Sequence, residues 1–265
     1  MNKLTILLLA VLAFASCKND TKEKETEEVT VEETETVEKE TEAQKSRFRV
    51  SPIQHATMVI TWDDTTIYVD PVGGSEAFKN FAAPDLILVT DIHQDHFSPE
   101  TIVALDTSNA KIIVPQAVAD KMPSEFATQI DVLNNGEIKE RLGFAVEAIP
   151  MYNLRPESLK YHEKGRGNGY VMEKNGKRVY ISGDTEDVPE MLALQDIDIA
   201  FVCMNLPYTM TEVQAANAVA TFKPKIVYPY HYRGASGFSN IEVFKARLKS
   251  ISEGQTQVVA LDWYQ

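Results

Sequence analysis

Four potential metal ligands follow a short apolar run in the first half of the chain. The run reads Leu86-Ile87-Leu88-Val89, and the ligands stand in the segment Asp91-Ile92-His93-Gln94-Asp95-His96. Such a run is typical of a buried strand. Carboxylates and imidazoles crowded at its end lose hydration unless a cation compensates them, and a strand end holds a ligand rigidly. The segment therefore predicts a divalent-metal site at the edge of a sheet, with a solvated Asp/His-rich turn as the alternative.

The first 46 residues differ in character from the rest. Residues 4–14 are apolar, too few to span a bilayer as a helix, and Ala15 and Ser16 follow directly before Cys17. This pattern predicts a signal peptide over residues 1–16. Small residues before a Cys resemble the lipobox of bacterial lipoproteins, which implies a lipid on Cys17, anchoring to a bacterial membrane and an extracytoplasmic location, on the periplasmic or surface face of the outer membrane. An ordinary signal peptide with an incidental Cys is the alternative.

Residues 17–46 form an acidic segment rich in Glu and Thr. After Cys17 it holds ten Glu and Asp20 against five Lys, with no aromatic residue. This composition predicts a disordered tether, with an export or partner signal as the alternative. The whole chain has a formal net charge of −13. Such a balance argues against binding to nucleic acid, and no oligomeric state follows from it.

Residues 47–265 are long enough for one domain with a substantial core. Short strands are predicted at 58–60 and 66–69, and strands then alternate with helices that begin near Ser98, Asp187, Thr211 and Ser239. Further strands are predicted at 86–89, 111–114, 129–132, 144–149, 170–172, 178–181, 197–204, 226–229 and 258–261. The order fits two half-sheets with helices outside. Cys203 lies within an apolar run, which favours a buried core thiol over a nucleophile.

Two later segments add ligands to the cluster around residues 91–96. Asp184 follows a predicted hairpin strand in Ser182-Gly183-Asp184-Thr185, and His231 follows another strand. A carboxylate can give one oxygen to each of two ions, so Asp184 is a candidate bridging ligand. A turn or capping role for Asp184 and a packed His231 are the alternatives.

Across residues 47–265 the chain resembles the metallo-β-lactamase fold superfamily. The strand-end signature of that family is His-x-His-x-Asp-His, and Asp91-x-His93-x-Asp95-His96 matches three of its four positions. The resemblance implies an α/β fold, an αββα sandwich of two mixed β-sheets with helices outside. It also implies two divalent metal ions, Zn²⁺ before Mn²⁺ or Fe²⁺. The implied first site contains Asp91, His93 and Asp184, and the implied second site contains Asp95, His96, Asp184 and His231.

The resemblance also marks residues around the two sites. Asn153 stands where most relatives have a His, so it is a weak or indirect ligand candidate. His55-Ala56-Thr57 and Asp70-Pro71 resemble the branch that contains ascorbate-6-phosphate lactonase and the N-acylphosphatidylethanolamine-hydrolysing phospholipase. There His55 is expected beside the metals or lining the pocket, with a core histidine as the alternative.

A polar, glycine-rich loop holds His162. We expect this histidine to cover the metals and to bind substrate, act as a general acid or replace the missing ligand, and a surface histidine is the alternative. Arg155, Arg166 and Arg233 are candidate contacts for an anionic group, and Tyr208 is a candidate for the pocket mouth.

The expected activity is metal-dependent hydrolysis. A metal-bound hydroxide, oriented by Asp95, would attack an ester, lactone or phosphodiester in a small-molecule or lipid-derived substrate. The alternative is a non-catalytic metal- or ligand-binding lipoprotein that keeps the fold, since Asp91 and Asn153 depart from the family pattern.

Overall fold

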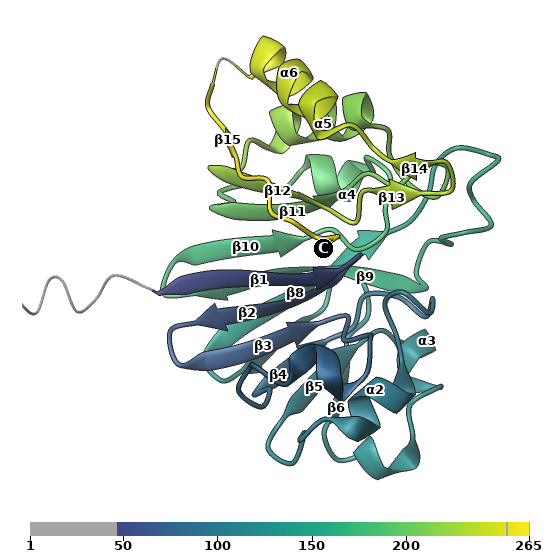
Figure 1. Cartoon of the computed structure of the whole chain (residues 1–265), viewed down its shortest axis with the longest axis vertical. Coiled ribbons are helices and arrows are strands. Elements are labelled where there is room, and N and C mark those ends of the chain that lie inside the picture. Colours follow the sequence, from purple (N-terminus) through teal and green to yellow (C-terminus); the bar gives the residue numbers. More distant parts are fainter. Residues whose placement is uncertain (1–46, 253, 265) are drawn as a thin grey trace, which may run out of the picture. The chain divides into compact units, whose positions relative to one another are not determined.

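Two mixed β-sheets lie face to face in the computed structural model, which describes residues 47–252 and 254–264 (Figure 1). The predicted signal peptide, the lipidation site Cys17 and the acidic tether lie outside the described residues. The first sheet has the spatial order β1 (Phe48–Gln54), β2 (Thr57–Trp62), β3 (Thr65–Val69), β4 (Leu86–Leu88), β5 (Lys111–Val114) and β6 (Ile130–Val132). Strands β1 to β3 run antiparallel, and β3 to β6 run parallel.

The second sheet also combines both strand directions. Its spatial order is β15 (Gln257–Val258), β12 (Ile226–Tyr230), β11 (Ile199–Cys203), β10 (Lys177–Ile181), β9 (Gly167–Lys174), β8 (Phe144–Met151) and β7 (Ile138–Arg141). Neighbouring strands from β15 to β10 pair in parallel, and those from β10 to β7 pair antiparallel. The predicted class, two mixed sheets with helices outside, is confirmed.

Short helices cover the outer sides of the sheets (Figure 1). They are η1 (Ser75–Phe78), α2 (Pro99–Ala104), α3 (Gln116–Ala119), η2 (Ser124–Phe126), α4 (Pro189–Leu192), α5 (Glu212–Phe222) and α6 (Ile241–Ile251), and a small hairpin joins β13 (Arg233–Gly234) to β14 (Gly237–Phe238). Side-chain caps start the longer helices: Thr211 accepts from the Gln214 amide, and Asn240 from the amides of Glu242 and Val243. Over the described ranges, no helix is long and apolar enough to cross a membrane.

Successive residues of a strand face opposite sides of its sheet, and the core follows this pattern. In β2, Met58, Ile60 and Trp62 pack with the second sheet in one cluster, while Val59 belongs to a cluster that includes helix residues. Full burial of one such side chain contributes about 1.5–3 kcal/mol, so the interior between the sheets is the main source of stability. Cys203 is fully buried in this core, as predicted.

The strand predictions need correction at three strands: β1, β7 and β15. Strands β1 and β7 were not predicted, because each is an edge strand with exposed positions; β7 reads Ile-Lys-Glu-Arg. The last strand ends at Val258, not at residue 261.

Candidate metal centre

The carboxyl ends of several parallel strands carry the polar side chains of the candidate site. Asp70 follows β3, residues 91–96 follow β4, Asp184 follows β10, Asn205 follows β11 and His231 follows β12. Parallel neighbours end at the same edge of their sheet, so side chains far apart in sequence meet there. His162 arrives differently, from the loop between β8 and β9.

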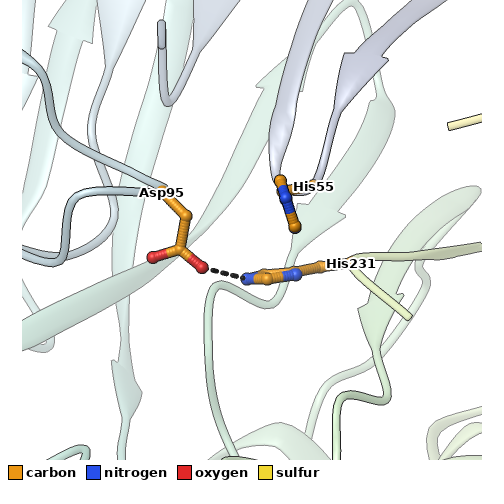
Figure 2. A group of neighbouring side chains, drawn as sticks. All are labelled: His55, Asp95 and His231. Atoms are coloured by element: carbon orange, nitrogen blue, oxygen red, sulfur yellow. Dashed lines mark ion pairs between the residues drawn. The ribbon is translucent and has the colours of Figure 1, made fainter. Parts of the chain in front are cut away.

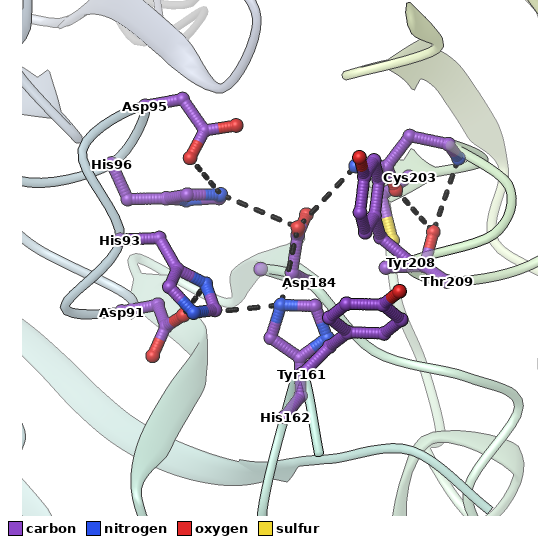
Figure 3. Close-up of polar contacts among 12 residues, drawn as sticks. Asp91, His93, Asp95, His96, Tyr161, His162, Asp184, Cys203, Tyr208 and Thr209 are labelled. Atoms are coloured by element: carbon purple, nitrogen blue, oxygen red, sulfur yellow. Dashed lines mark hydrogen bonds and ion pairs between the residues drawn. The ribbon is translucent and has the colours of Figure 1, made fainter. Parts of the chain in front are cut away.

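Asp184 lies at the centre of the cluster, and Figure 3 shows the imidazoles of His96 and His162 directed at its carboxylate. Its Oδ2 is 3.5 Å from His96 Nε2 and 3.4 Å from His162 Nε2. Its Oδ1 is 3.4 Å from His231 Nε2. Gly183 allows this close packing, because it has φ of +61° and a Cβ would meet Met151 Sδ at 2.4 Å. The two oxygens of one buried carboxylate therefore face different imidazoles.

His96 and His231 form one side of the cluster. Their Nε2 atoms are 3.2 Å apart, and Asp95 Oδ2 is 3.3 Å from His231 Nε2. His96 Nδ1 lies 2.8 Å from Asp70 Oδ2. A carboxylate at one imidazole nitrogen fixes the ring orientation and leaves the other nitrogen for a metal. Asp70 thus aims His96 Nε2 at Asp184.

Asp70 itself is held by the residue before the ligand segment. Thr90 donates to its carboxylate through the backbone N–H and through Oγ1, both at 2.7 Å. Sequence analysis did not assign Asp70 to the site, although a charged residue directly after the apolar strand β3 was a usable signal.

Asp91 and His93 form the other side. Asp91 Oδ2 is 2.6 Å from His93 Nδ1 and 3.9 Å from His162 Nε2. Arg166 also donates to Asp91, from Nε at 3.2 Å and Nη2 at 3.1 Å. The prediction of Arg166 as a substrate contact is corrected, since its guanidinium is engaged with a buried carboxylate.

His162 is buried, at 2% exposure. Its Nε2 faces both Asp184 and Asp91, and its ring meets that of His93 edge-on at 5.2 Å (Figure 3). The expectation of a surface histidine is therefore wrong. Of the functional readings, the position beside Asp91 and Asp184 is compatible with a replacement metal ligand.

Asn153 braces loops. Its Nδ2 donates to the carbonyls of Ser158 at 2.8 Å and Tyr208 at 2.7 Å. Its Oδ1 is buried and accepts no hydrogen bond within the described residues. Asn153 therefore supports the loop that carries His162 through Nδ2, and its Oδ1 stays a weak or indirect ligand candidate.

Arg155 is likewise structural. Its Nε donates to Glu186 Oε1 at 2.6 Å, and its Nη2 donates to the carbonyls of Pro207 and Thr209. Glu186 is fully buried, so the ion pair compensates its charge. The prediction of Arg155 as a substrate contact is corrected. The sequence offered no signal for Glu186, because its partner lies in another loop.

A cavity of about 420 Å³ opens beside Asp184. It is lined by His93, Gln94, Asp95, Tyr161, His162, Asp184, Asn205 and Tyr208. Tyr161 and Tyr208 meet edge-to-face at 5.0 Å and form one wall (Figure 3). The predicted pocket residue Tyr208 is thus at the cavity, while Tyr161 and Asn205 were missed, since nothing in their local sequence distinguishes them from packing residues.

His55 and Arg233 lie on the far side of His231. The rings of His55 and His231 meet at 5.5 Å and 79° (Figure 2). On its other side, the His55 ring contacts Tyr264. Burial lowers the pKa of His55, and the neighbouring His231 lowers it further. Arg233 has an exposed side chain on β13.

Charge in the cluster is balanced between buried acids and imidazoles. Burial alone would raise the pKa of Asp91, but the hydrogen bond and charge of His93 lower it to about 2. Burial would also raise the pKa of Asp184, yet His231 and His96 hold it well below its usual range. These carboxylates are therefore ionised at neutral pH.

The donor set fits divalent cations. Asp184 Oδ1 has no hydrogen-bond partner within the described chain, although it is buried. The Nε2 atoms of His96 and His231 are 3.2 Å apart. Two nitrogen lone pairs at this distance repel each other unless a proton or a metal ion lies between them. Imidazole and carboxylate donors in this combination suit Zn²⁺, Fe²⁺ or Mn²⁺.

Comparison with known proteins agrees with this architecture. The family described as the β-lactamase superfamily domain matches residues 49–231. A metal-dependent hydrolase of Pyrococcus abyssi is 30% identical over 193 residues, which cover 69% of this chain and 84% of that protein. One of Nanoarchaeum equitans is 33% identical over 191 residues, covering 69% and 83%.

Solved structures give the same result. A crystal structure from Parabacteroides distasonis, assigned to the metal-dependent hydrolases, has 40% identity and a TM-score of 0.74, covering 83% of this chain and 94% of that one. The metallo hydrolase Igni18 of Ignicoccus hospitalis shares the fold at 21% identity and a TM-score of 0.69, covering 82% and 96%. The chain therefore belongs to the β-lactamase superfamily, among its metal-dependent hydrolases of the metallo-β-lactamase fold.

Proposed function

We propose that the protein is a two-metal hydrolase that cleaves an ester, lactone or phosphodiester bond in a small-molecule or lipid-derived substrate. The observation that carries the proposal is the carboxylate of Asp184, whose Oδ2 faces His96 and His162 while its Oδ1 faces His231. A buried carboxylate with imidazoles on both oxygens has the donor arrangement of a bridging ligand.

The ligands divide into two sets that share Asp184. The first set is Asp91, His93, His162 and Asp184, and the second is Asp95, His96, Asp184 and His231. With His162 in place of Asn153, the first set contains two imidazoles and two carboxylates. Zn²⁺ suits such a set, and Mn²⁺ or Fe²⁺ are the alternatives.

The bound ions would polarise the scissile bond and lower the pKa of water. Asp95 is suited to orient the attacking water, because its side chain is 43% exposed and lines the cavity, whereas those of Asp91 and Asp184 are 0% and 4% exposed. Asn205 also lines the cavity, and its Nδ2 donates to Asp184 Oδ2 at 3.3 Å, which helps to hold that carboxylate in place. Tyr208 would pack against the rest of the substrate.

An anionic substrate group remains part of the proposal, now supported by one arginine. Arg166 and Arg155 are engaged with Asp91 and Glu186. Arg233 has no ion-pair partner in the part of the chain that the structure describes, and it lies two residues after His231. A guanidinium in this position can bind a phosphate or carboxylate beside the ions.

The test combines metal analysis with a panel of esters, lactones and phosphodiesters. The parent protein should bind two ions per chain, as the two ligand sets require, and should hydrolyse one class. Asp184→Ala should lose metal and lower kcat/KM at least ~100-fold, because both sets use that carboxylate. Asp187→Ala, in the same loop, is the control and should behave like the parent.

Two results would contradict the proposal. One ion at saturation would exclude the two-metal arrangement. Two ions without hydrolysis of any substrate class would favour the non-catalytic binding protein.

A further inference from the structure

A third group of potential ligands lies on the outer side of His231. It contains His55, Asp95 and His231, and one ligand atom from each lies within 4.8 Å of the others. Figure 2 shows His55 over the His231 ring, with the Asp95 carboxylate paired to His231. Asp95 and His231 also belong to the second metal set, so this group extends that set by one imidazole.

The same nitrogen of His231 serves both groups. Its Nε2 is 3.3 Å from Asp95 Oδ2 and 3.4 Å from Asp184 Oδ1. An ion bound to this nitrogen would therefore lie between Asp95 and Asp184, close to the group that includes His55. Ligand atoms within 4.8 Å of one another are compatible with metal–ligand distances of about 2.0–2.2 Å.

The backbone presents both imidazoles in an unusual conformation. His55, in the tight turn between β1 and β2, has φ of +48°, and His231, directly after β12, has φ of +45°. Non-glycine residues adopt such angles rarely, and the strain is often found at functional sites. The two rings are thus brought together from opposite sheets.

The contacts of the His55 ring with Tyr264 leave its Nε2 free within the described residues. Its Nδ1 lies 3.5 Å from Tyr264 Oη, at the limit of a hydrogen bond. Within residues 47–252 and 254–264, its Nε2 makes no hydrogen bond. The ring is half-buried against the ring of Tyr264 at 5.2 Å. One imidazole nitrogen therefore stays available on the side of the cluster.

We propose that His55 is a fifth ligand of the second metal ion, contributed by the first sheet. The inference rests on the proposed two-metal function. The second ion would then have three imidazoles, from His55, His96 and His231, with carboxylates from Asp95 and Asp184. Such a nitrogen-rich set favours Zn²⁺, Co²⁺ or Fe²⁺ over Mg²⁺ or Ca²⁺.

Co²⁺ titration of the full chain followed by visible absorption tests the proposal. His55→Gly is the variant, because glycine accepts the positive φ and leaves room for free imidazole. We expect about a 10-fold or greater loss of affinity for the second Co²⁺, and a stronger visible absorption as five-coordinate Co²⁺ becomes four-coordinate. Added imidazole should restore the parent spectrum. Tyr264→Phe keeps the ring beside His55 and should leave the spectrum unchanged.

The outcomes separate this inference from the proposed function. If the parent binds two Co²⁺ ions and His55→Gly has the same spectrum and affinities, His55 is not a ligand, while the two-metal function stands. If affinity falls but imidazole restores neither affinity nor spectrum, His55 acts only on the structure of the turn, and the inference is overturned. A parent that binds fewer than two ions instead contradicts the proposed function.

Discussion

His162 shows how a single residue can complete a cluster without standing at a strand end. Its carbonyl accepts a hydrogen bond from the backbone N–H of Asn153 at 3.0 Å. The carbonyl of the neighbouring Tyr161 accepts a hydrogen bond from the Arg166 side chain. Arg166 is itself bound to Asp91. The loop is therefore tied on both sides of His162, which limits the motion of the imidazole beside Asp184.

Replacing His162 should remove a ligand, and not only a proton donor. His162→Ala should lose one of two ions and weaken the remaining first-site affinity by more than the ~10- to 100-fold typical of an outer hydrogen-bond partner. Elemental analysis and competition with a chelator measure both quantities. Tyr161→Phe, the adjacent control, should keep both ions. A His162→Ala protein with two tightly bound ions and low turnover would show that His162 is a catalytic acid.

The sequence predicts which side chains converge where each directly follows a buried strand, as Asp184 and His231 do, because a strand end fixes their direction. Asn153 also follows a strand, β8, yet its amide donates to carbonyls of two loops. Those carbonyls belong to residues 5 and 55 positions away, and no local pattern reports them. Loop contacts of this kind set the direction of the Asn153 side chain.

At the scale of elements, one ion-pair cluster joins the edges of the two sheets. Asp131 on β6 accepts hydrogen bonds from Arg141 on β7 through both carboxylate oxygens, at 2.5 Å each. Lys139 Nζ lies 3.1 Å from Asp131 Oδ1. The Asp131 side chain is 12% exposed. A two-point contact with arginine that is largely shielded from water is stronger than an ordinary surface ion pair.

Asp131→Asn should therefore lower the free energy of unfolding by about 1–2 kcal/mol at pH 7. Burial alone raises the pKa of Asp131, but the hydrogen bonds from Arg141 and Lys139 lower it below its usual value. A lowered pKa stabilises the fold above the unfolded-state pKa, and this contribution is lost as pH falls through the folded-state pKa.

Chemical unfolding of the parent and Asp131→Asn at pH 7 and near pH 3 measures the difference. The gap should narrow in acid, and Glu140→Gln, an exposed change on the same strand, should have no comparable effect. A gap that is equal at both pH values would mean that packing, and not charge, is responsible.

Strand β7 marks the limit of prediction for elements. Interior strands such as β4 and β11 are recognisable because both faces are buried and the residues are apolar. Strand β7 alternates exposed and half-buried positions, and its pairing with β8 is visible only in three dimensions. The order of the layers was therefore predictable from the sequence, while the edge strands β1 and β7 were not.

For the whole molecule, the formal net charge of −13 sets how an anionic substrate could be recognised. Long-range attraction cannot help such a substrate, because the protein carries the same sign of charge. Recognition must instead come from short-range contacts with the bound ions and with Arg233. An uncharged ester or lactone would avoid the repulsion, so the substrate panel should include neutral members of each class.

The proposed membrane anchor gives the last prediction. Cys17 follows the small residues Ala15 and Ser16, and Cys203 is the second of two cysteines in the chain. Cys17→Ser should abolish incorporation of labelled fatty acid and leave an unanchored or unprocessed protein, because lipid attachment requires that thiol. Cys203→Ala is the matched control and should stay labelled, since burial raises the pKa of the Cys203 thiol to about 12 and keeps it inaccessible. Fractionation of membranes followed by detection of the label makes the comparison. Persistent labelling of Cys17→Ser would refute the anchor without affecting the metal centre, which is formed by residues 55–231.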